Sequence, residues 1–125
     1  MPKVIALVDD LFFRARIAET AKHVGVELEA AANGDDLLAR ASNANGAGAA
    51  LILVDLNSLA APLDALQRLH AAGNQIPVVA FLSHVQTELA AAAHAAGCTE
   101  VMPRSKFTQD LAAILERARE ARSAG

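Results

Sequence analysis

Cysteine and aromatic residues are scarce in this chain of 125 residues. The single cysteine, Cys98, excludes an internal disulfide and a zinc site built from several cysteines, and it favours a reducing compartment. The aromatic residues are four Phe, with no Trp or Tyr, which is too few for a surface on which single-stranded nucleic acid stacks. The core must therefore be built mainly from Leu, Val, Ile and Ala.

Long hydrophobic runs and a large charge of one sign are also missing. The first apolar run ends at Asp9-Asp10 and is too short for a signal peptide, and no run approaches the roughly 20 residues of a membrane span. The net charge of -3 argues against a general binder of phosphate backbones. We expect a soluble cytoplasmic protein, a single domain over residues 1–125, without direct contact to nucleic acid or membrane.

Short β-branched runs alternate with longer stretches of helical period, which is the pattern of an α/β protein with a parallel sheet. Strands are predicted at 3–8, 26–31, 51–54, 77–82 and 100–102. Helices are predicted from the Asp9-Asp10 pair to Val24 and at 36–41, 62–72, 87–96 and 108–121. With right-handed crossovers, this strict alternation gives a doubly wound, five-stranded, three-layer sandwich.

Individual residues refine this pattern. The first helix is expected to bury Phe13, Ile17, Ala21 and Val24, and the last one Leu111, Ile114, Leu115 and Ala118. Asn33-Gly34 is interpreted as a turn, with Asp35 as the cap of the following helix. Residues 42–49 hold no large side chain and are interpreted as a loop. Cys98 is expected in the core, and Phe12 is expected to pack its helix or to cover a wall of a pocket.

Polar side chains follow four of the five predicted strands. They are Asp9 and Asp10 after the first strand, Asp55 after the third, Ser83 and His84 after the fourth, and Arg104 after the fifth. In such sheets, ligands bind beyond the carboxyl ends of the strands. Each acid taken alone could equally be a helix cap or a solvated loop residue, and His84 is interpreted as a solvated loop residue unless it contacts the pocket.

Three carboxylates at one edge repel one another unless a cation lies among them. Mg²⁺ suits such oxygen ligands, and it would neutralise an incoming phosphoryl group while a carboxylate attacks it. Arg104 and the hydroxyl of Ser83 would hold the other phosphoryl oxygens. The residues therefore point to phosphoryl chemistry at this edge.

The chain resembles the receiver domain of bacterial two-component response regulators, the CheY-like family, over residues 3–121. The resemblance depends on Val8-Asp9-Asp10, Asp55-Leu56-Asn57, Ile76-Pro77-Val78-Val79 and Ala96-Gly97-Cys98, in this order. Asp10 and Asp55 lie 45 positions apart, as the family would place them. The resemblance implies a flavodoxin-like sandwich with that family's strand arrangement.

The resemblance also implies a function and a set of site residues. Asp55 matches the aspartate that accepts a phosphoryl group from a histidine kinase or a phosphotransfer protein. Asp9 and Asp10 match the acids that bind Mg²⁺ together with Asp55, and Asn57 matches the residue whose carbonyl completes that site. The segment Leu89–Ala121 matches the surface that contacts a downstream protein target, so the chain is expected to signal and not to be an enzyme.

Several positions depart from the family pattern. Leu82 falls where the family has a Thr or Ser switch, unless a bulge brings Ser83 there, and Val101 replaces an aromatic residue. Arg104-Ser105 replaces the family's Lys, for which Lys106 could substitute only after a shift of the loop. The Gly expected soon after the acceptor is absent between Asn57 and Ala65.

Three hypotheses follow. The first is a stand-alone receiver phosphorylated on Asp55. The second is a pseudo-receiver that ignores phosphate and acts as an interaction or dimerisation module. The alanine-rich stretch Leu89–Ala96 would permit close packing in a homodimer, or simply packing on the sheet. The third, a small hydrolase, lacks a base placed next to a nucleophile.

Overall fold

The computed structural model describes residues 2–43, 49–83 and 86–124. The strands are β1 Lys3–Leu7, β2 Glu27–Ala30, β3 Ala49–Asp55, β4 Val78–Leu82 and β5 Glu100–Pro103. The helices are α1 Leu11–Val24, α2 Gly34–Asn43, α3 Pro62–Ala71, α4 Thr87–Ala95, α5 Arg104–Gln109 and α6 Leu111–Ala124. His84 and most of the predicted loop 42–49 lie outside the described residues.

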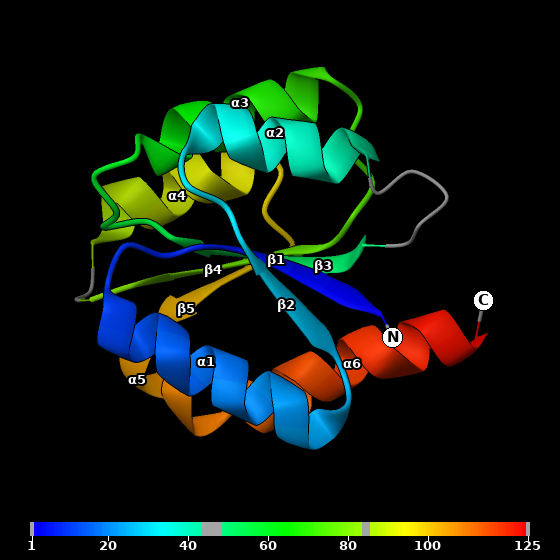
Figure 1. The fold of residues 1–125 in the computed structure, drawn as a ribbon. Helices are drawn as coiled ribbons and strands as arrows, with labels where there is room; N and C mark the ends of the chain where they lie inside the picture. Colours follow the sequence, from blue (N-terminus) through cyan, green and yellow to red (C-terminus); the bar gives the residue numbers. More distant parts are fainter. Residues whose placement is uncertain (1, 44–48, 84–85, 125) are drawn as a thin grey trace.

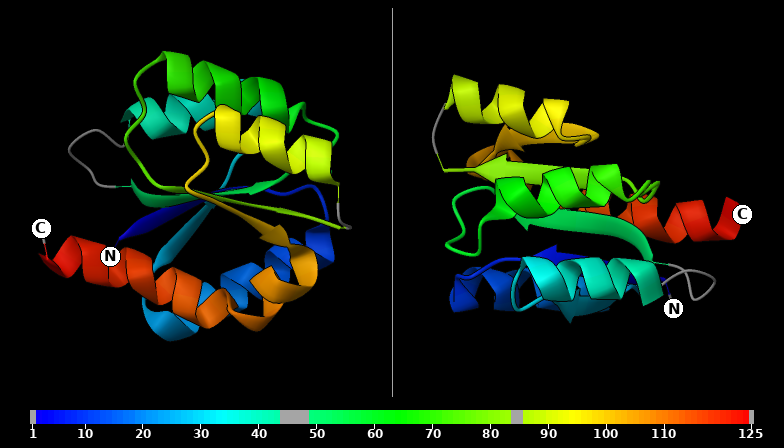
Figure 2. Two further views of the ribbon diagram at one scale, coloured as in Figure 1. Left: turned by 180° about the vertical axis from the view of Figure 1, so that it is seen from behind. Right: turned by 90° about the horizontal axis from the view of Figure 1, so that it is seen from above.

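The five strands form one parallel sheet in the order β2-β1-β3-β4-β5. Helices α2, α3 and α4 cover one face of this sheet, and α1, α5 and α6 cover the other (Figures 1 and 2). The predicted doubly wound α/β sandwich is therefore confirmed. Its order changes direction between β1 and β3, the place where ligands bind in sheets of this kind.

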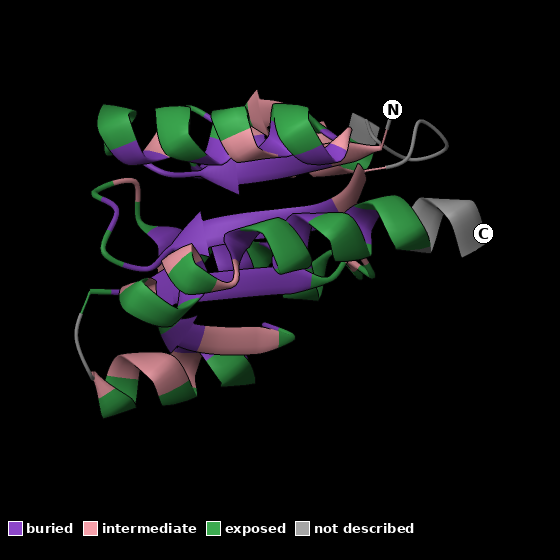
Figure 3. Cartoon of the chain, turned by 90° about the horizontal axis from the view of Figure 1, so that it is seen from below, coloured by how far each residue is buried: buried purple, intermediate pink, exposed green. Residues whose placement is uncertain are grey.

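The sheet separates two hydrophobic cores. Side chains alternate along each strand, so Val4 and Ala6 of β1 join one core while Ile5 and Leu7 join the other. Strand β4 is buried along its whole length, whereas the edge strand β2 is only partly covered (Figure 3). Continuous apolar runs such as that of β4 are typical of strands covered on both faces.

Sequence periodicity identified the inner faces of two helices correctly. The predicted face of α1 is buried, as is the predicted face of α6, from Leu111 to Ala118. Cys98 is also buried, with 7% of its surface exposed. Within the described residues, no helix has both the length and the apolar character needed to cross a bilayer.

Two predicted helix starts are wrong. Helix α2 begins at Gly34, and its first turn is capped by Asn33, whose Oδ1 accepts a hydrogen bond from Asp36 N at 2.9 Å, not by Asp35. The predicted start of the last helix at residue 108 is four residues too late, because Pro103 leads directly from β5 into α5, which begins at Arg104. A break at Asp110 then separates α5 from α6. Arg104 consequently lies in the first turn of a helix and not in a loop.

Candidate functional site

The predicted site residues meet at the carboxyl edge of the sheet. Neighbouring strands end in register there, with Leu7 of β1 beside Val54 of β3 and Leu82 of β4 beside Pro103 of β5. The acids that follow β1, the acid that ends β3 and the arginine that follows β5 therefore share one rim. We call this group of Asp9, Asp10, Asp55 and Arg104 the acidic rim.

Asp55 is the last residue of β3, and only 6% of its surface is exposed. Its Oδ1 accepts a hydrogen bond from Asn57 N at 2.9 Å, and no described residue donates a hydrogen bond to its other oxygen. Burial raises the pKa of Asp55; the Asn57 hydrogen bond and Arg104 oppose this, while Asp9 and Asp10 add to it. The carboxyl thus has one oxygen without a hydrogen bond from the described residues, and its pKa responds to the charges of the other three rim residues.

Asp9 anchors the loop that follows β3. Its Oδ1 accepts from Ser58 Oγ at 2.8 Å and its Oδ2 accepts from Leu59 N at 2.6 Å. Ser58 is itself buried and its Oγ accepts from Ala60 N at 3.0 Å. Both oxygens of Asp9 therefore accept hydrogen bonds from the loop between β3 and α3.

Asp10 has two structural tasks as well. It is the N-cap of α1, where its Oδ1 accepts from Phe12 N and Phe13 N at 3.0 and 3.1 Å. Its Oδ2 accepts from Nη2 of Arg104 at 2.9 Å. The hydrogen bond from Phe13 and the contact with Arg104 lower the pKa of Asp10, so this carboxyl stays ionised.

Arg104, and not Lys106, supplies the cation of the rim. The guanidinium carbon of Arg104 lies 4.0 Å from the centre of the Phe13 ring, a distance typical of cation–π contact. Lys106 instead forms an ion pair with Asp110 one turn along α5, at 2.7 Å. In this structure the Lys106 ammonium is therefore directed to Asp110 and not to the acidic rim.

Ser83 and Asn57 form a second cluster beside Asp55. Asn57 Oδ1 accepts from both Ser83 N at 2.7 Å and Ser83 Oγ at 2.8 Å, and Asn57 Nδ2 donates to Gln86 Oε1 at 2.9 Å. Leu82, 4% exposed, holds the last position of β4 without a bulge. The Ser83 hydroxyl is therefore close to the site but is bound to Asn57.

Sequence reasoning missed some of the residues that shape this site. Ser58 donates a hydrogen bond to Asp9, and Gln86 accepts one from Asn57, so both residues fix loops around the site. The only sequence clue to Ser58 is its position three residues after Asp55. Phe12 does not pack against its helix, since 91% of its surface is exposed. Leu11, which precedes Phe12 in the chain, is 66% exposed, and Leu59, whose N–H donates to Asp9, is 96% exposed.

The oxygen donors of the rim are of the kind that Mg²⁺ prefers, but two of the three carboxylates are already engaged within the chain. In residues 2–43, 49–83 and 86–124, no three His, Cys, Asp or Glu side chains are grouped so that they could hold a metal. The reason is visible in the hydrogen bonds, because Asp9 and Asp10 each use both oxygens within the chain. The predicted Mg²⁺ set of Asp9, Asp10, Asp55 and Asn57 stays a prediction.

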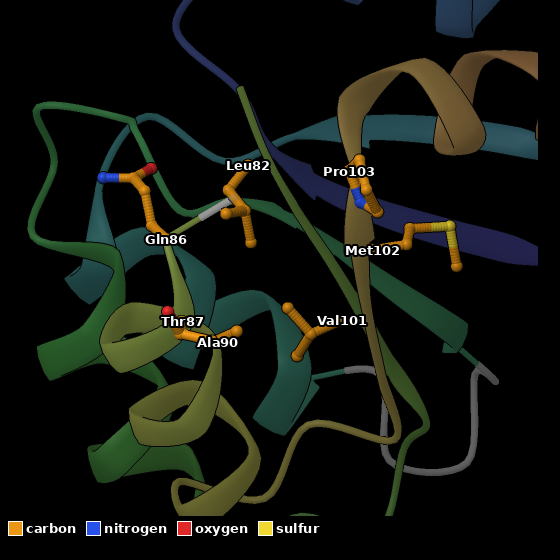
Figure 4. Close-up of a pocket in the computed structure, with 7 residues that line it drawn as sticks. All are labelled: Leu82, Gln86, Thr87, Ala90, Val101, Met102 and Pro103. Carbon is orange, nitrogen blue, oxygen red and sulfur yellow. The ribbon is translucent and has the colours of Figure 1, made fainter. Parts of the chain in front are cut away.

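An apolar pocket lies beside the rim, between α4 and the ends of β4 and β5 (Figure 4). It is lined by Leu82, Gln86, Thr87, Ala90, Val101, Met102 and Pro103. Val101 is the position at which the family pattern has an aromatic residue. The small side chain of Val101 points into this pocket.

Sheet order and helix placement give the doubly wound fold that is found in CheY-like response regulator receivers. Comparison with solved structures agrees. The receiver domain protein from Clostridium thermocellum superimposes with a TM-score of 0.80 at 17% identity, covering 99% of this chain and 98% of that one. The Mn²⁺-bound response regulator Rcp1 gives a TM-score of 0.73 at 18% identity, covering 93% and 90%.

A longer protein also contains this fold. NtrX from Brucella abortus gives a TM-score of 0.74 at 24% identity; the match covers 97% of this chain but only 27% of that one. No family model matches the sequence, and no curated protein matches it. At such identities the likeness establishes the fold, which is that of the receiver domains.

Proposed function

We propose that the chain is a receiver module of two-component signalling that accepts a phosphoryl group on Asp55. The observation that carries this proposal is the placement of Asp55. It is a buried acid at the end of a central strand, with one oxygen held by Asn57 N and the other free of hydrogen bonds from the described residues. A carboxylate held in this way can present one oxygen to an electrophile.

The phosphoryl donor would be a phosphohistidine on a histidine kinase or on a phosphotransfer protein. One Asp55 oxygen forms a bond to phosphorus while the bond between phosphorus and the imidazole nitrogen breaks. The electron pair of that bond stays on the imidazole. Arg104 lies near enough to lower the pKa of Asp55, and its positive charge would oppose the charge that accumulates on the phosphoryl oxygens.

Exposed apolar side chains support contact with a donor protein at the same edge. Phe12 and Leu59 are almost fully exposed, and their N–H groups donate to Asp10 and Asp9 at the rim, so both apolar side chains start at the edge where a donor protein would approach. The phosphorylated module would then act on a downstream protein in the cytoplasm. No step of this proposal needs nucleic acid or a membrane.

A phosphorylation assay tests the proposal. The full chain is incubated with acetyl phosphate, with and without Mg²⁺, and analysed by intact-mass spectrometry. We expect the mass increment of one phosphoryl group, lost in Asp55→Asn and kept in Asp64→Asn, which removes an exposed acid of α3. Absence of the increment from the unaltered chain at millimolar reagent, or its persistence in Asp55→Asn, would reject Asp55 as the acceptor.

A second candidate function has its own observation in favour. Because Asp9 and Asp10 are engaged within the chain and buried Leu82 ends β4, the module could act without phosphate, as an interaction or dimerisation domain. In that case Asp55→Asn leaves partner binding and the sedimentation coefficient unchanged. A large change in either on the same substitution would count against it.

A further inference from the structure

The acidic rim contains a cation that belongs to the chain itself. Arg104 leaves the end of β5 and contacts Asp10, the cap of α1, at 2.9 Å, although the two residues are 94 positions apart. Their side chains are 33% and 41% exposed, so the pair is partly withdrawn from solvent. A guanidinium matches a carboxylate in shape and stays charged at all accessible pH values.

Contacts on the far side of Arg104 hold its guanidinium in place. The group lies over the Phe13 ring, and that ring packs edge-on against Phe81 at 5.4 Å and tilted against Phe107 at 5.9 Å. At the backbone, Arg104 O accepts a hydrogen bond from Thr108 Oγ1 at 2.8 Å. The arginine is thus positioned before any ligand arrives, which lowers the entropy cost of its contact with Asp10.

A divalent cation and Arg104 would compete for the same oxygen. Asp10 Oδ1 already accepts from the first turn of α1, and its Oδ2 is the one that Arg104 contacts. A metal bound through Asp10 must displace the guanidinium or share the oxygen with it, at a distance where two positive charges repel. Arg104 also stabilises the ionised form of Asp55, a task that a metal would otherwise perform.

We infer that Arg104 is the resident counter-ion of the acidic rim and competes with divalent cations for Asp10, so that it keeps the metal affinity of this chain low. The inference shares the rim with the proposed function and concerns its regulation. It does not depend on transfer of a phosphoryl group to Asp55, since metal binding is measured separately.

The test is a Mn²⁺ titration of the full chain, with free Mn²⁺ followed by electron paramagnetic resonance. Replacing Arg104 with Gln should tighten Mn²⁺ binding roughly tenfold, from relief of one unit of charge repulsion at contact distance. Arg104→Lys retains the charge but not the planar guanidinium, and it should gain less Mn²⁺ affinity than Arg104→Gln. The matched control is Arg117→Gln, which removes one positive charge from an ion pair with Glu100 at the other end of β5.

A second variant, Arg104→Met, keeps an apolar side chain over Phe13 and is used if Arg104→Gln fails to fold. It should show the same gain in Mn²⁺ affinity. Adding Asp10→Asn to Arg104→Gln should abolish the gain, because the freed carboxylate is then missing. Equal Mn²⁺ affinities for the unaltered chain, Arg104→Gln and Arg104→Met would overturn the inference, and so would an equal gain in Arg117→Gln. Failure of Asp55 to accept phosphate would leave these outcomes unaffected.

Discussion

The carboxyl of Asp55 is buried in the folded protein. This burial raises its pKa above the value of 3.8 that it has in an unfolded chain. The folded state therefore binds a proton more tightly than the unfolded state does. Stability falls as the pH rises from the unfolded pKa through the folded pKa, and it stays lower above both. At neutral pH, ionised Asp55 thus lowers the free energy of unfolding.

Replacement of Asp55 with Asn should raise Tm at pH 7 by a few degrees, since the amide removes the buried charge and keeps an oxygen for the hydrogen bond from Asn57. The gain should shrink as the pH falls below the unfolded pKa of 3.8, where both states are protonated. Thermal unfolding followed by circular dichroism at both pH values measures it. A destabilised Asp55→Asn variant at pH 7 would contradict the sign argued here.

Cys98 gives a second prediction at the residue scale. Burial raises the pKa of its thiol to about 11, and the thiolate is the reactive form. At pH 8 the native protein should therefore react with Ellman's reagent on the order of a hundredfold more slowly than the chain unfolded in guanidinium. Similar rates in the two states would show that the thiol is accessible and not part of the core.

At the scale of elements, the contact between α3 and the end of α4 depends on a glycine. Gly97 follows α4 with a φ of 99°, and a Cβ added there would lie 2.7 Å from Nδ1 of His70, near the end of α3. Gly73 follows α3 with a φ of 81°, but an added Cβ would meet nothing within 4 Å. The two positions share the backbone strain and differ in the steric contact.

Gly73→Ala should cost about 1–2 kcal/mol of unfolding free energy, which is the strain of a left-handed residue with a side chain. Gly97→Ala should cost more, by the work of moving His70 aside. Urea unfolding measures both values, and His70→Ala combined with Gly97→Ala should recover the excess. If the two single variants were equally stable, the His70 contact would not restrict this site.

The sequence predicts strands and inner helix faces well, because periodicity is a local property. The face of α1 from Phe13 to Val24 follows from spacing alone. The start of α5 does not, since Pro103 and Arg104 carry no apolar period and the buried Phe107 determines where that helix packs. Helix starts depend on a few backbone and capping contacts that different sequences can supply.

The same distinction applies to the acidic rim. Parallel strands place their carboxyl ends at one edge, so the meeting of Asp9, Asp10 and Asp55 could be predicted from sequence. The direction of each carboxylate could not. Asp9 turns to Ser58 and Leu59, and Asp10 turns to Arg104, which lies 94 positions away along the chain. Such choices depend on tertiary contacts that no local pattern encodes.

At the scale of the whole molecule, the aromatic side chains lie on one side of the sheet. Phe13, Phe81 and Phe107 form a single cluster, with the rings of Phe81 and Phe107 stacked at 4.3 Å. The described core on the other face consists of aliphatic residues and Cys98. The cluster joins α1, β4 and α5, and its Phe13 ring also contacts Arg104. The same aromatic packing therefore stabilises this core and positions the cation of the rim.

Phe107 should therefore contribute strongly to global stability. It is fully buried, and Phe107→Ala should cost about 3–5 kcal/mol through lost burial and the cavity left behind. Because a domain of this size has only about 5–15 kcal/mol of stability in total, the midpoint of urea unfolding should fall steeply. Phe12→Ala, which truncates a 91% exposed ring, should change the free energy by less than about 0.5 kcal/mol. Comparable losses in the two variants would mean that the ring cluster does not hold α5 against the sheet.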